Sequence, residues 1–277
     1  MRGRGPAGLA ALALVAALIS GCGDDGGGEP IRAGLPAAGG GGSLTYALPS
    51  LPPALDPLGA RDRSALTVTR QVHEPLVAKP TAPYGGDRSE PGLALSVTAS
   101  GDRRTWRMAL RPNVRFQDGT PFNAAAVLAN ARRWIGAPRG RRLLPRLFAV
   151  DAPRPDEVRF ILREPIPDLA RRLSDPRLGI VSPQALDPQS GEGSRFRDEA
   201  EGSGTGAFRA GRIGGDRIEL SRHADWWGTP LGLGPALDGV AFVLALGSPQ
   251  RLELLRAGSV EVADPLEAAE LAAADAD

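Results

Sequence analysis

Residues 105–135 read TWRMALRPNVRFQDGTPFNAAAVLANARRWI, and this stretch decides the fold that the sequence predicts. Trp106, Met108 and Leu110 occupy every second position, which is the period of a strand with one buried face. The dipeptide Asp-Gly that starts at Asp118 is typical of a turn. We expect a strand, a turn, a short strand and a second turn, followed by a helix. No side chain here suits covalent catalysis, so the stretch is a scaffold.

The helix of this stretch has signals at both of its ends. Asn123 can accept a hydrogen bond from a free backbone N–H of the first turn, and Gly136 stands where a C-terminal cap is expected. One helical face collects the apolar residues Val127, Leu128, Ala131, Trp134 and Ile135. The pattern predicts an amphipathic helix that begins after Asn123 and ends near Gly136.

Similar patterns predict the other elements. Strands are expected at residues 44–48, 157–163 and 240–244, a hairpin at Gly214-Gly215, and helices at residues 66–73, 168–173, 249–257 and 265–274. The strand at 157–163 can pair with residues 105–110 in one sheet. Residues 138–146 are rich in arginine and are interpreted as a solvated loop, with contact to an anionic ligand or a lipid headgroup as the alternative.

The string LRPNVRFQDGTPFNA at residues 110–124 closely resembles the LR-x-G-V-x-F-x-DGTPF-x-A signature of the bacterial extracellular solute-binding proteins that serve peptide-type ABC importers. Asn113 stands where glycine is common, and Ala126 stands where an acid often completes a capping box. Both departures concern stability more than ligand choice. The resemblance implies an α/β fold, the mixed sheet with flanking helices of type II periplasmic binding proteins.

Further segments resemble the same family across residues 44–277. They are LDP at 55–57, QVHEPL at 71–76, PGLA at 91–94, GTGAF at 204–208, DWWG at 225–228 and AGSVEV at 257–262. Family members continue well beyond this length, cross a hinge into a second lobe and bind their ligand between the two lobes. The resemblance therefore implies a first lobe only, with a subdomain near residues 74–165 and the second lobe missing.

Two segments have the family position of the cleft edge, and the resemblance implies that they contact the ligand. The residues are Ser50, Leu51 and Pro52 after the first strand, and Gly204, Thr205 and Gly206 in the glycine turn. A phosphate-binding role for the glycine turn is disfavoured, because it lacks the lysine and the full spacing of a phosphate motif.

The histidines and tryptophans each leave two interpretations. His73 replaces an aromatic residue of the family and is interpreted as a half-buried packing residue rather than a ligand or a pH switch. No metal site is expected, because His73 and His223 lack Cys or His neighbours at metal spacing. The adjacent Trp226 and Trp227 cannot share one strand face. Both are interpreted as core residues, with one lining the cleft as the alternative.

The N-terminus resembles the signal of a bacterial lipoprotein. An apolar run at residues 9–19 follows two arginines and is shorter than the about 20 residues of a membrane-spanning helix. It leads into Ile-Ser-Gly-Cys at residues 19–22, which looks like a lipoprotein box, and Cys22 is the only cysteine. In that class the signal is cut before the cysteine, whose thiol then carries diacylglycerol.

We therefore expect a signal peptide at residues 1–21, lipidation at Cys22 and a flexible glycine-rich tether at residues 22–43. The alternative is an ordinary secretory signal with an incidental cysteine. Removal of residues 1–21 takes away two arginines and no acid, which leaves 31 basic against 32 acidic residues and a net charge of −1. A chain with this net charge lacks the excess of positive charge that favours binding to nucleic acid.

Together these features predict a lipid-anchored extracytoplasmic solute-binding component of an ABC importer for peptides. Its expected partners are a peptide or another small solute, the permease subunits and, through the lipid, the outer face of the cytoplasmic membrane. We expect a monomer without a cofactor. With half of a two-lobed clamp, this chain would bind solute weakly or not at all.

Two alternatives belong to other classes of protein. One is a surface lipoprotein whose vestigial binding fold serves as an interaction module. The other is an envelope hydrolase, which is disfavoured because the chain has no Gly-x-Ser-x-Gly motif, no His-x-x-x-His motif and no cysteine other than Cys22.

Overall fold

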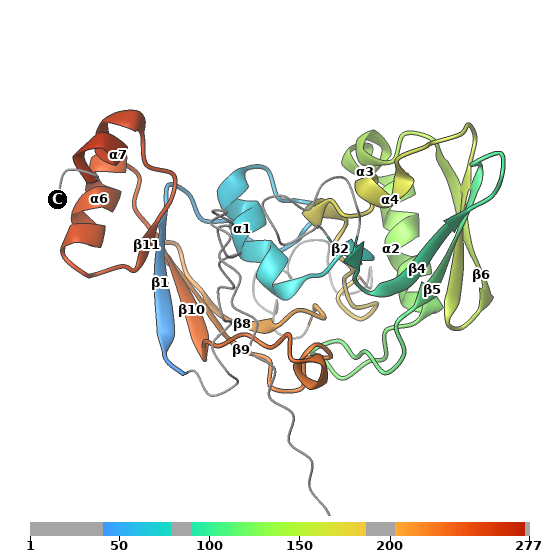
Figure 1. Cartoon of the computed structure of the whole chain (residues 1–277), viewed down its shortest axis with the longest axis horizontal. Helices are drawn as coiled ribbons and strands as arrows, with labels where there is room; N and C mark the ends of the chain where they lie inside the picture. Colours follow the sequence, from blue (N-terminus) through green and yellow to red (C-terminus); the bar gives the residue numbers. More distant parts are fainter. Residues whose placement is uncertain (1–40, 79–89, 187–202, 275–277) are drawn as a thin grey trace, which may run out of the picture. The chain divides into compact units, whose positions relative to one another are not determined.

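The computed structural model describes residues 41–78, 90–186 and 203–274 (Figure 1). The expected signal peptide, Cys22 and most of the expected tether lie outside the described residues. Within the described part, the strands form a five-stranded, a four-stranded and a two-stranded sheet. None of the helices described there is both long enough and apolar enough to cross a membrane.

The helices and strands have the following bounds. The helices are α1 (Arg63–Val72), α2 (Ala124–Gly136), α3 (Pro138–Leu143), α4 (Leu169–Arg172), η1 (Pro176–Leu178), η3 (Thr229–Leu231), α6 (Ser248–Arg256) and α7 (Ala268–Ala274). The strands are β1 (Ser43–Leu48), β2 (Val77–Ala78), β3 (Glu90–Pro91), β4 (Ala94–Ala99), β5 (Thr105–Leu110), β6 (Leu147–Arg154), β7 (Glu157–Leu162), β8 (Phe208–Ile213), β9 (Arg217–Arg222), β10 (Gly239–Leu244) and β11 (Val262–Ala263).

The five-stranded sheet mixes parallel and antiparallel pairs in the order β11-β1-β10-β9-β8. β1 is parallel to both of its neighbours, β10 and β11, whereas β9 is antiparallel to β10 and β8. Ser43 pairs with Gly239 and Leu48 pairs with Leu244, so β1 and β10 match along their whole length. The sheet therefore joins the start of the described chain to a strand near its end.

Helices α1 and α6 cover opposite faces of this sheet. Val72 of α1 packs in one apolar cluster with Leu48 of β1, and Leu255 of α6 packs in a separate cluster with Ala47 of β1. Successive residues of a strand point to opposite faces. Since Ala47 and Leu48 are neighbours, the two helices lie on different sides.

The four-stranded sheet has the order β4-β5-β7-β6, and its neighbouring strands are all antiparallel. The expected pairing of β5 with β7 is confirmed, with Trp106 opposite Phe160 and Met108 opposite Val158. These four residues share one apolar cluster with Trp134 of α2, which is buried. The helix and the strand of the signature stretch thus build one core.

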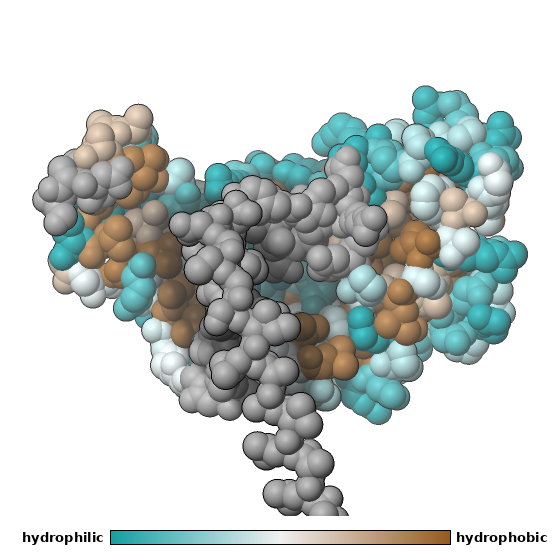
Figure 2. Space-filling model, viewed as in Figure 1, coloured by the Kyte–Doolittle hydropathy of each residue, from teal (hydrophilic) through white to brown (hydrophobic). Residues whose placement is uncertain are grey.

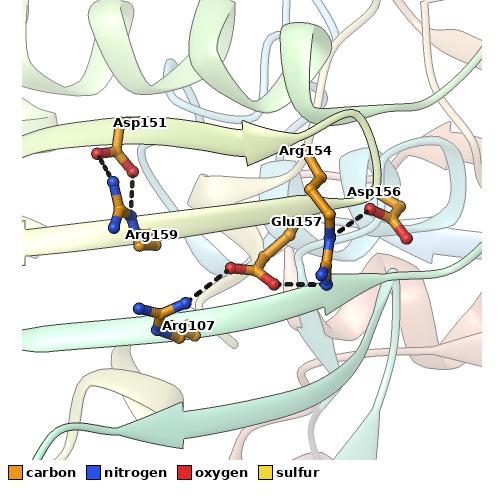
Figure 3. Close-up of polar contacts among 6 residues, drawn as sticks. All are labelled: Arg107, Asp151, Arg154, Asp156, Glu157 and Arg159. Carbon is orange, nitrogen blue, oxygen red and sulfur yellow. Dashed lines mark hydrogen bonds and ion pairs between the residues drawn. The ribbon is translucent and has the colours of Figure 1, made fainter.

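The other face of this sheet carries ion pairs (Figure 3). Glu157 on β7 contacts Arg107 on β5 at 3.3 Å and Arg154 at the end of β6 at 2.7 Å. Arg159 on β7 donates to both oxygens of Asp151 on β6, at 2.7 and 2.5 Å. Figure 2 shows hydrophilic surface over the part that Figure 1 labels β6. Exposed pairs contribute only about 0–1 kcal/mol each, so they add little to stability.

The signature stretch forms its strand and helix as predicted. Asn123 caps α2, because its Oδ1 accepts a hydrogen bond from Ala126 N at 3.2 Å. Asn113 has a φ of 61°, a conformation that glycine adopts freely and asparagine tolerates. That φ explains the glycine which is common there in the resembling family. The expected short strand is reduced to one bridge between Arg115 and Pro121.

The boundaries of α1 and α2 differ from the prediction. α1 begins at Arg63 rather than at residue 66, because Asp62 Oδ1 accepts a hydrogen bond from Ala65 N at 2.8 Å and caps the helix. Gly136 is the last residue of α2 and not its cap, since the following Ala137 takes that position. Both differences concern helix ends, where capping contacts decide the last turn.

The prediction of a solvated arginine-rich loop is wrong over residues 138–143, because these residues form α3. Pro138 is the first helical residue, a position where its fixed φ suits a helix and its missing N–H leaves no hydrogen bond unmade. Arg139 Nη1 donates to Leu58 O at 3.0 Å and to Ala60 O at 2.9 Å. This arginine is therefore a structural contact rather than part of a solvated loop.

Asn130 ties α2 to the segment that follows η1. Its side chain is fully buried. Its Nδ2 donates to Ala126 O at 2.9 Å and to Val181 O at 2.8 Å, and its Oδ1 accepts from Val181 N at 3.1 Å. Val181 lies outside the strands, so its buried N–H and C=O have no strand partner. Asn130 supplies a hydrogen-bond partner for each of these two groups.

We expect Asn130→Ala to lower the free energy of unfolding by about 3 kcal/mol, because it leaves the buried N–H and C=O of Val181 without their partner. Asn123→Ala is the matched control, since it removes a helix cap and costs about 1 kcal/mol. Urea denaturation followed by circular dichroism measures both losses. Equal losses in the two variants would contradict the role assigned to Asn130.

Candidate functional site

The carboxyl ends of the parallel strands β1 and β10 lie side by side in the five-stranded sheet. The chain leaves β1 towards α1 on one face and leaves β10 towards α6 on the other face. In open α/β sheets, ligands bind outside the carboxyl ends of the strands, at the point where the connections change sides. We call residues 49–52 and 245–248, which follow the two strands, the carboxyl-end site.

The first half of the carboxyl-end site contains three of the expected ligand residues. Ser50 and Leu51 are half-buried, and Pro52 is buried. Ser50 Oγ donates to Asp62 Oδ2 at 3.1 Å, so the loop after β1 is tied to the residue that caps α1. These residues lie where the sheet topology places a ligand, and their contact with one stays a prediction.

The second half of the site was missed by the sequence analysis. Ala245 N donates to Leu48 O at 2.8 Å, which continues the pairing of β1 with β10. Leu246 is 73% exposed, and Figure 2 shows hydrophobic surface over the part that Figure 1 labels α6 and α7. No local sequence pattern marks Leu246. Only the parallel pairing of β10 with β1 brings it beside the loop after β1.

Arg251 holds the second loop in place. Its guanidinium is buried, with 3% of the residue exposed. Nη1 donates to Ala245 O at 2.7 Å and to Leu246 O at 3.0 Å, while Nε and Nη2 donate to Pro265 O at 2.9 and 2.7 Å. These hydrogen bonds replace water around a buried charge and fix the loop after β10 against the chain after β11.

Charged and phenolic side chains gather where β1 and β11 end. Tyr46 OH donates to Asp264 Oδ2 at 3.1 Å, and Arg63 Nη2 lies 3.4 Å from the same oxygen. Burial, followed by the Asp264 carboxylate, raises the pKa of Tyr46. The Arg63 side chain is 80% exposed, so its ion pair with Asp264 is open to exchange with an anionic group of a solute.

The glycine turn lies at the opposite end of α1 from Ser50. Gly206 N donates to Val72 O at 2.8 Å, on the last residue of the helix, whereas Ser50 contacts Asp62 at the first cap. A helix rises 1.5 Å per residue, so the 10 residues of α1 separate the two contacts by about 15 Å. The structure does not bring the two groups of expected ligand residues together.

Close backbone packing accounts for both glycines of the turn. A Cβ atom on Gly204 would lie 1.9 Å from Val72 O, and one on Gly206 would lie 2.4 Å from Gln71 O. Gln117 adds two hydrogen bonds, from its N to Gly204 O at 2.8 Å and from its Nε2 to Gly206 O at 3.1 Å. The turn is thus bound by the chain itself, and a ligand role for it stays a prediction.

Glu74 connects the glycine turn to the tryptophan pair. Its Oε2 accepts hydrogen bonds from Thr205 Oγ1 at 2.8 Å and from Trp227 Nε1 at 2.7 Å. The guanidinium carbon of Arg111 lies 4.2 Å from the centroid of the Trp227 ring. Burial raises the pKa of Glu74 to about 7, and the hydrogen bonds from Trp227 and Thr205 oppose this rise only in part. No role for Glu74 was predicted from the sequence, although its place in QVHEPL was an available signal.

The structure gives the burial and the contacts of the two tryptophans and of His73. Trp226 and Trp227 are both half-buried, with ring centroids 5.2 Å apart. His73 is a packing residue that is fully buried rather than half-buried, and its Nε2 lies 2.9 Å from Ser203 Oγ. Burial lowers the pKa of His73 to about 4. Among residues 41–78, 90–186 and 203–274, no group of three His, Cys, Asp or Glu side chains could hold a metal ion.

Comparison with known proteins finds a family and relatives for this chain. The family of bacterial extracellular solute-binding proteins, family 5 Middle, matches residues 88–277. The probable D,D-dipeptide-binding periplasmic protein DdpA of Escherichia coli K12 is 28% identical over 220 residues, which are 78% of this chain and 42% of DdpA. The glutathione-binding protein GsiB of the same strain is 27% identical over 219 residues, which are 76% of this chain and 40% of GsiB.

Solved structures share the fold. The periplasmic binding protein DppA from Helicobacter pylori, in complex with the peptide STSA, matches 80% of this chain and 46% of its own with a TM-score of 0.69 and 23% identity. NikA from Brucella suis, in complex with Fe(III)-EDTA, matches 79% of this chain and 42% of its own with a TM-score of 0.68 and 26% identity. The chain thus spans less than half the length of these relatives.

Burial shifts the neighbouring pKa values of His73 and Glu74 in opposite directions. Unfolded His73, with a pKa of 6.5, takes up a proton that the folded state refuses until about pH 4, so stability is lost as the pH falls through this window. Unfolded Glu74, with a pKa of 4.5, releases a proton that the folded state keeps until about pH 7, so stability is lost as the pH rises. The two effects oppose each other between these limits.

We expect single substitutions to separate the two effects. Relative to the unsubstituted protein, His73→Gln gains stability as the pH falls from 6.5 to about 4. Glu74→Gln gains stability as the pH rises from 4.5 to about 7. Each slope reaches about 1 kcal/mol per pH unit. Urea denaturation across the window measures the free energy of unfolding of the three proteins. The same pH dependence in all three would contradict the two pKa shifts.

Proposed function

The chain belongs to the bacterial extracellular solute-binding proteins of family 5, and we propose that it is the solute-binding component of an ABC importer for peptides. The family match over residues 88–277 carries this proposal. Three relatives support the peptide class by their names alone: DdpA as a probable D,D-dipeptide-binding protein, GsiB as a glutathione-binding protein, and DppA in complex with a peptide. We infer that the protein binds its solute without chemical change and acts as a monomer.

We place the solute at the carboxyl-end site. The loop after β1 offers the Ser50 hydroxyl and the half-buried Leu51 side chain, and the loop after β10 offers the exposed Leu246. A peptide has both polar backbone groups and apolar side chains, so this mixture suits it. Leu246 is a large apolar side chain in water, and covering it with a ligand is favourable.

We propose that residues 44–277 form the first lobe of a two-lobed binding protein, with a subdomain near residues 74–165. The chain spans 40–46% of the length of the relatives described above. In a hinged binding protein, a ligand shifts the equilibrium towards a state in which two lobes enclose it. The carboxyl-end site would then supply one wall, and sequence of the kind found in the unmatched part of the relatives would supply the other.

We propose further that the protein works outside the cytoplasm, held to the outer face of the cytoplasmic membrane by a lipid on Cys22. The box Ile-Ser-Gly-Cys at residues 19–22 supports this anchor. The glycine-rich segment between Cys22 and β1 would then serve as a tether that keeps the binding fold near the permease while allowing it to turn.

Cys22→Ser tests the lipid anchor. We expect the variant to lose incorporation of radiolabelled palmitate and to leave the membrane fraction, because the serine hydroxyl does not receive the diacylglycerol. Ser20→Ala is the matched control, since a small residue at this position keeps the box. Equal labelling of the Cys22→Ser variant and the unsubstituted protein would contradict lipidation at this residue.

Uptake of labelled short peptides by the source bacterium tests the transport function. We expect deletion of the reading frame to abolish uptake of at least one peptide class and the restored gene to recover it. Leu246→Asp should restore about tenfold less uptake at limiting peptide, because it removes one apolar contact worth about 1.5 kcal/mol.

Leu95→Asp is the control for this substitution, since Leu95 is 43% exposed on β4 of the other sheet. Unchanged uptake of all peptides after deletion would contradict the transport function. Equal uptake with Leu246→Asp and Leu95→Asp would leave the function standing but contradict the carboxyl-end site.

A further inference from the structure

A small pocket lies beside α2 and α3, at the end of the four-stranded sheet where β6 begins. Its volume is about 180 Å³, and its walls include Trp134, Leu144 and Leu147. Trp134 and Leu144 are 1% and 2% exposed, so they lie beneath the pocket and leave the exposed groups of its rim to contact a ligand. The pocket shares no residue with the carboxyl-end site.

An aromatic side chain stands open at the rim of this pocket. Phe148 lines it and is 53% exposed. A phenylalanine that contacts water over half its surface gains free energy when a ligand covers it, at about 25 cal/mol for each Å². The pocket therefore offers an apolar contact that the chain itself leaves unfilled.

The charge around the pocket is positive. Arg141 and Arg163 line it, and no described residue of its lining carries a carboxylate. The guanidinium carbon of Arg163 lies 4.5 Å from the centroid of the Phe148 ring, and within the described chain Arg163 forms no ion pair. The nearby Glu164 is already paired with Arg146. An anion at the rim would thus meet a guanidinium without a competing acid.

Arg141 removes an obstacle to anion binding. The last carbonyl groups of α2 point away from the helix end and carry partial negative charge. Arg141 Nη1 donates to Ile135 O at 3.2 Å and to Gly136 O at 2.6 Å. The arginine neutralises these carbonyls, so the helix end does not repel a carboxylate at the pocket.

We propose that this pocket binds a small monocyclic carboxylate, with its ring against Phe148 and its carboxylate against Arg163. The size supports a single ring, because an apolar cavity of about 150 Å³ holds benzene. Two guanidinium groups support one negative charge. This site is separate from the proposed peptide site and does not depend on it.

Ligand-observed ¹⁹F NMR with 4-fluorobenzoate tests the proposal on the whole chain. We expect saturable binding in the millimolar range, as befits a ligand of about ten heavy atoms. The neutral 4-fluorobenzyl alcohol has the same ring without the charge, and we expect it to bind about fivefold more weakly. Absence of saturable binding of 4-fluorobenzoate would overturn the proposal.

Three variants locate the binding. Arg163→Gln should weaken 4-fluorobenzoate about fivefold and leave 4-fluorobenzyl alcohol unchanged, whereas Phe148→Ala should weaken both. Arg107→Gln is the matched control, because Arg107 is an exposed arginine on β5 outside the pocket. All three side chains are exposed, so the fold is expected to persist, which circular dichroism verifies. Equal effects of Arg163→Gln and Arg107→Gln would show non-specific attraction of anions and overturn the assignment.

Discussion

The parallel pairing of β1 with β10 on one side and β11 on the other is the constraint on which the rest of the structure depends. It joins residues 43–48 to residues 239–244, so the strands β2 to β7 are inserted between two paired strands of one sheet. The helices α1 and α6, which follow these two neighbouring strands, pack on opposite faces of the sheet. The carboxyl-end site exists only because these two connections diverge.

Buried polar side chains hold the loops around this sheet. Arg251 fixes the loop after β10 through backbone carbonyls, and Asn130 and Gln117 do the same for segments outside the strands. Glu74 joins the glycine turn to Trp227 at the far end of α1. Each of these contacts supplies a partner for a polar group that would otherwise be buried without one.

Local patterns predicted the elements of this fold better than they predicted its site. The strand at residues 105–110 and the cap at Asn123 follow from short-range periodicity and capping chemistry, and both are confirmed. The place of Leu246 was missed because it depends on pairing between distant strands. The separation of Ser50 from Gly206 was missed because it depends on which end of α1 each residue contacts. The family resemblance identified the glycine turn, but only the approach of Val72 O to Gly204 and Gly206 shows why glycine is required there.

Hydrogen–deuterium exchange of the membrane-extracted protein, with and without a saturating mixture of short peptides, tests the central claim most directly. That claim is that solute binds at the carboxyl ends of β1 and β10. We expect peptides to slow amide exchange at Ser50, Leu51, Leu246 and Gly247. Unchanged exchange in the loops after β1 and β10 would contradict the account.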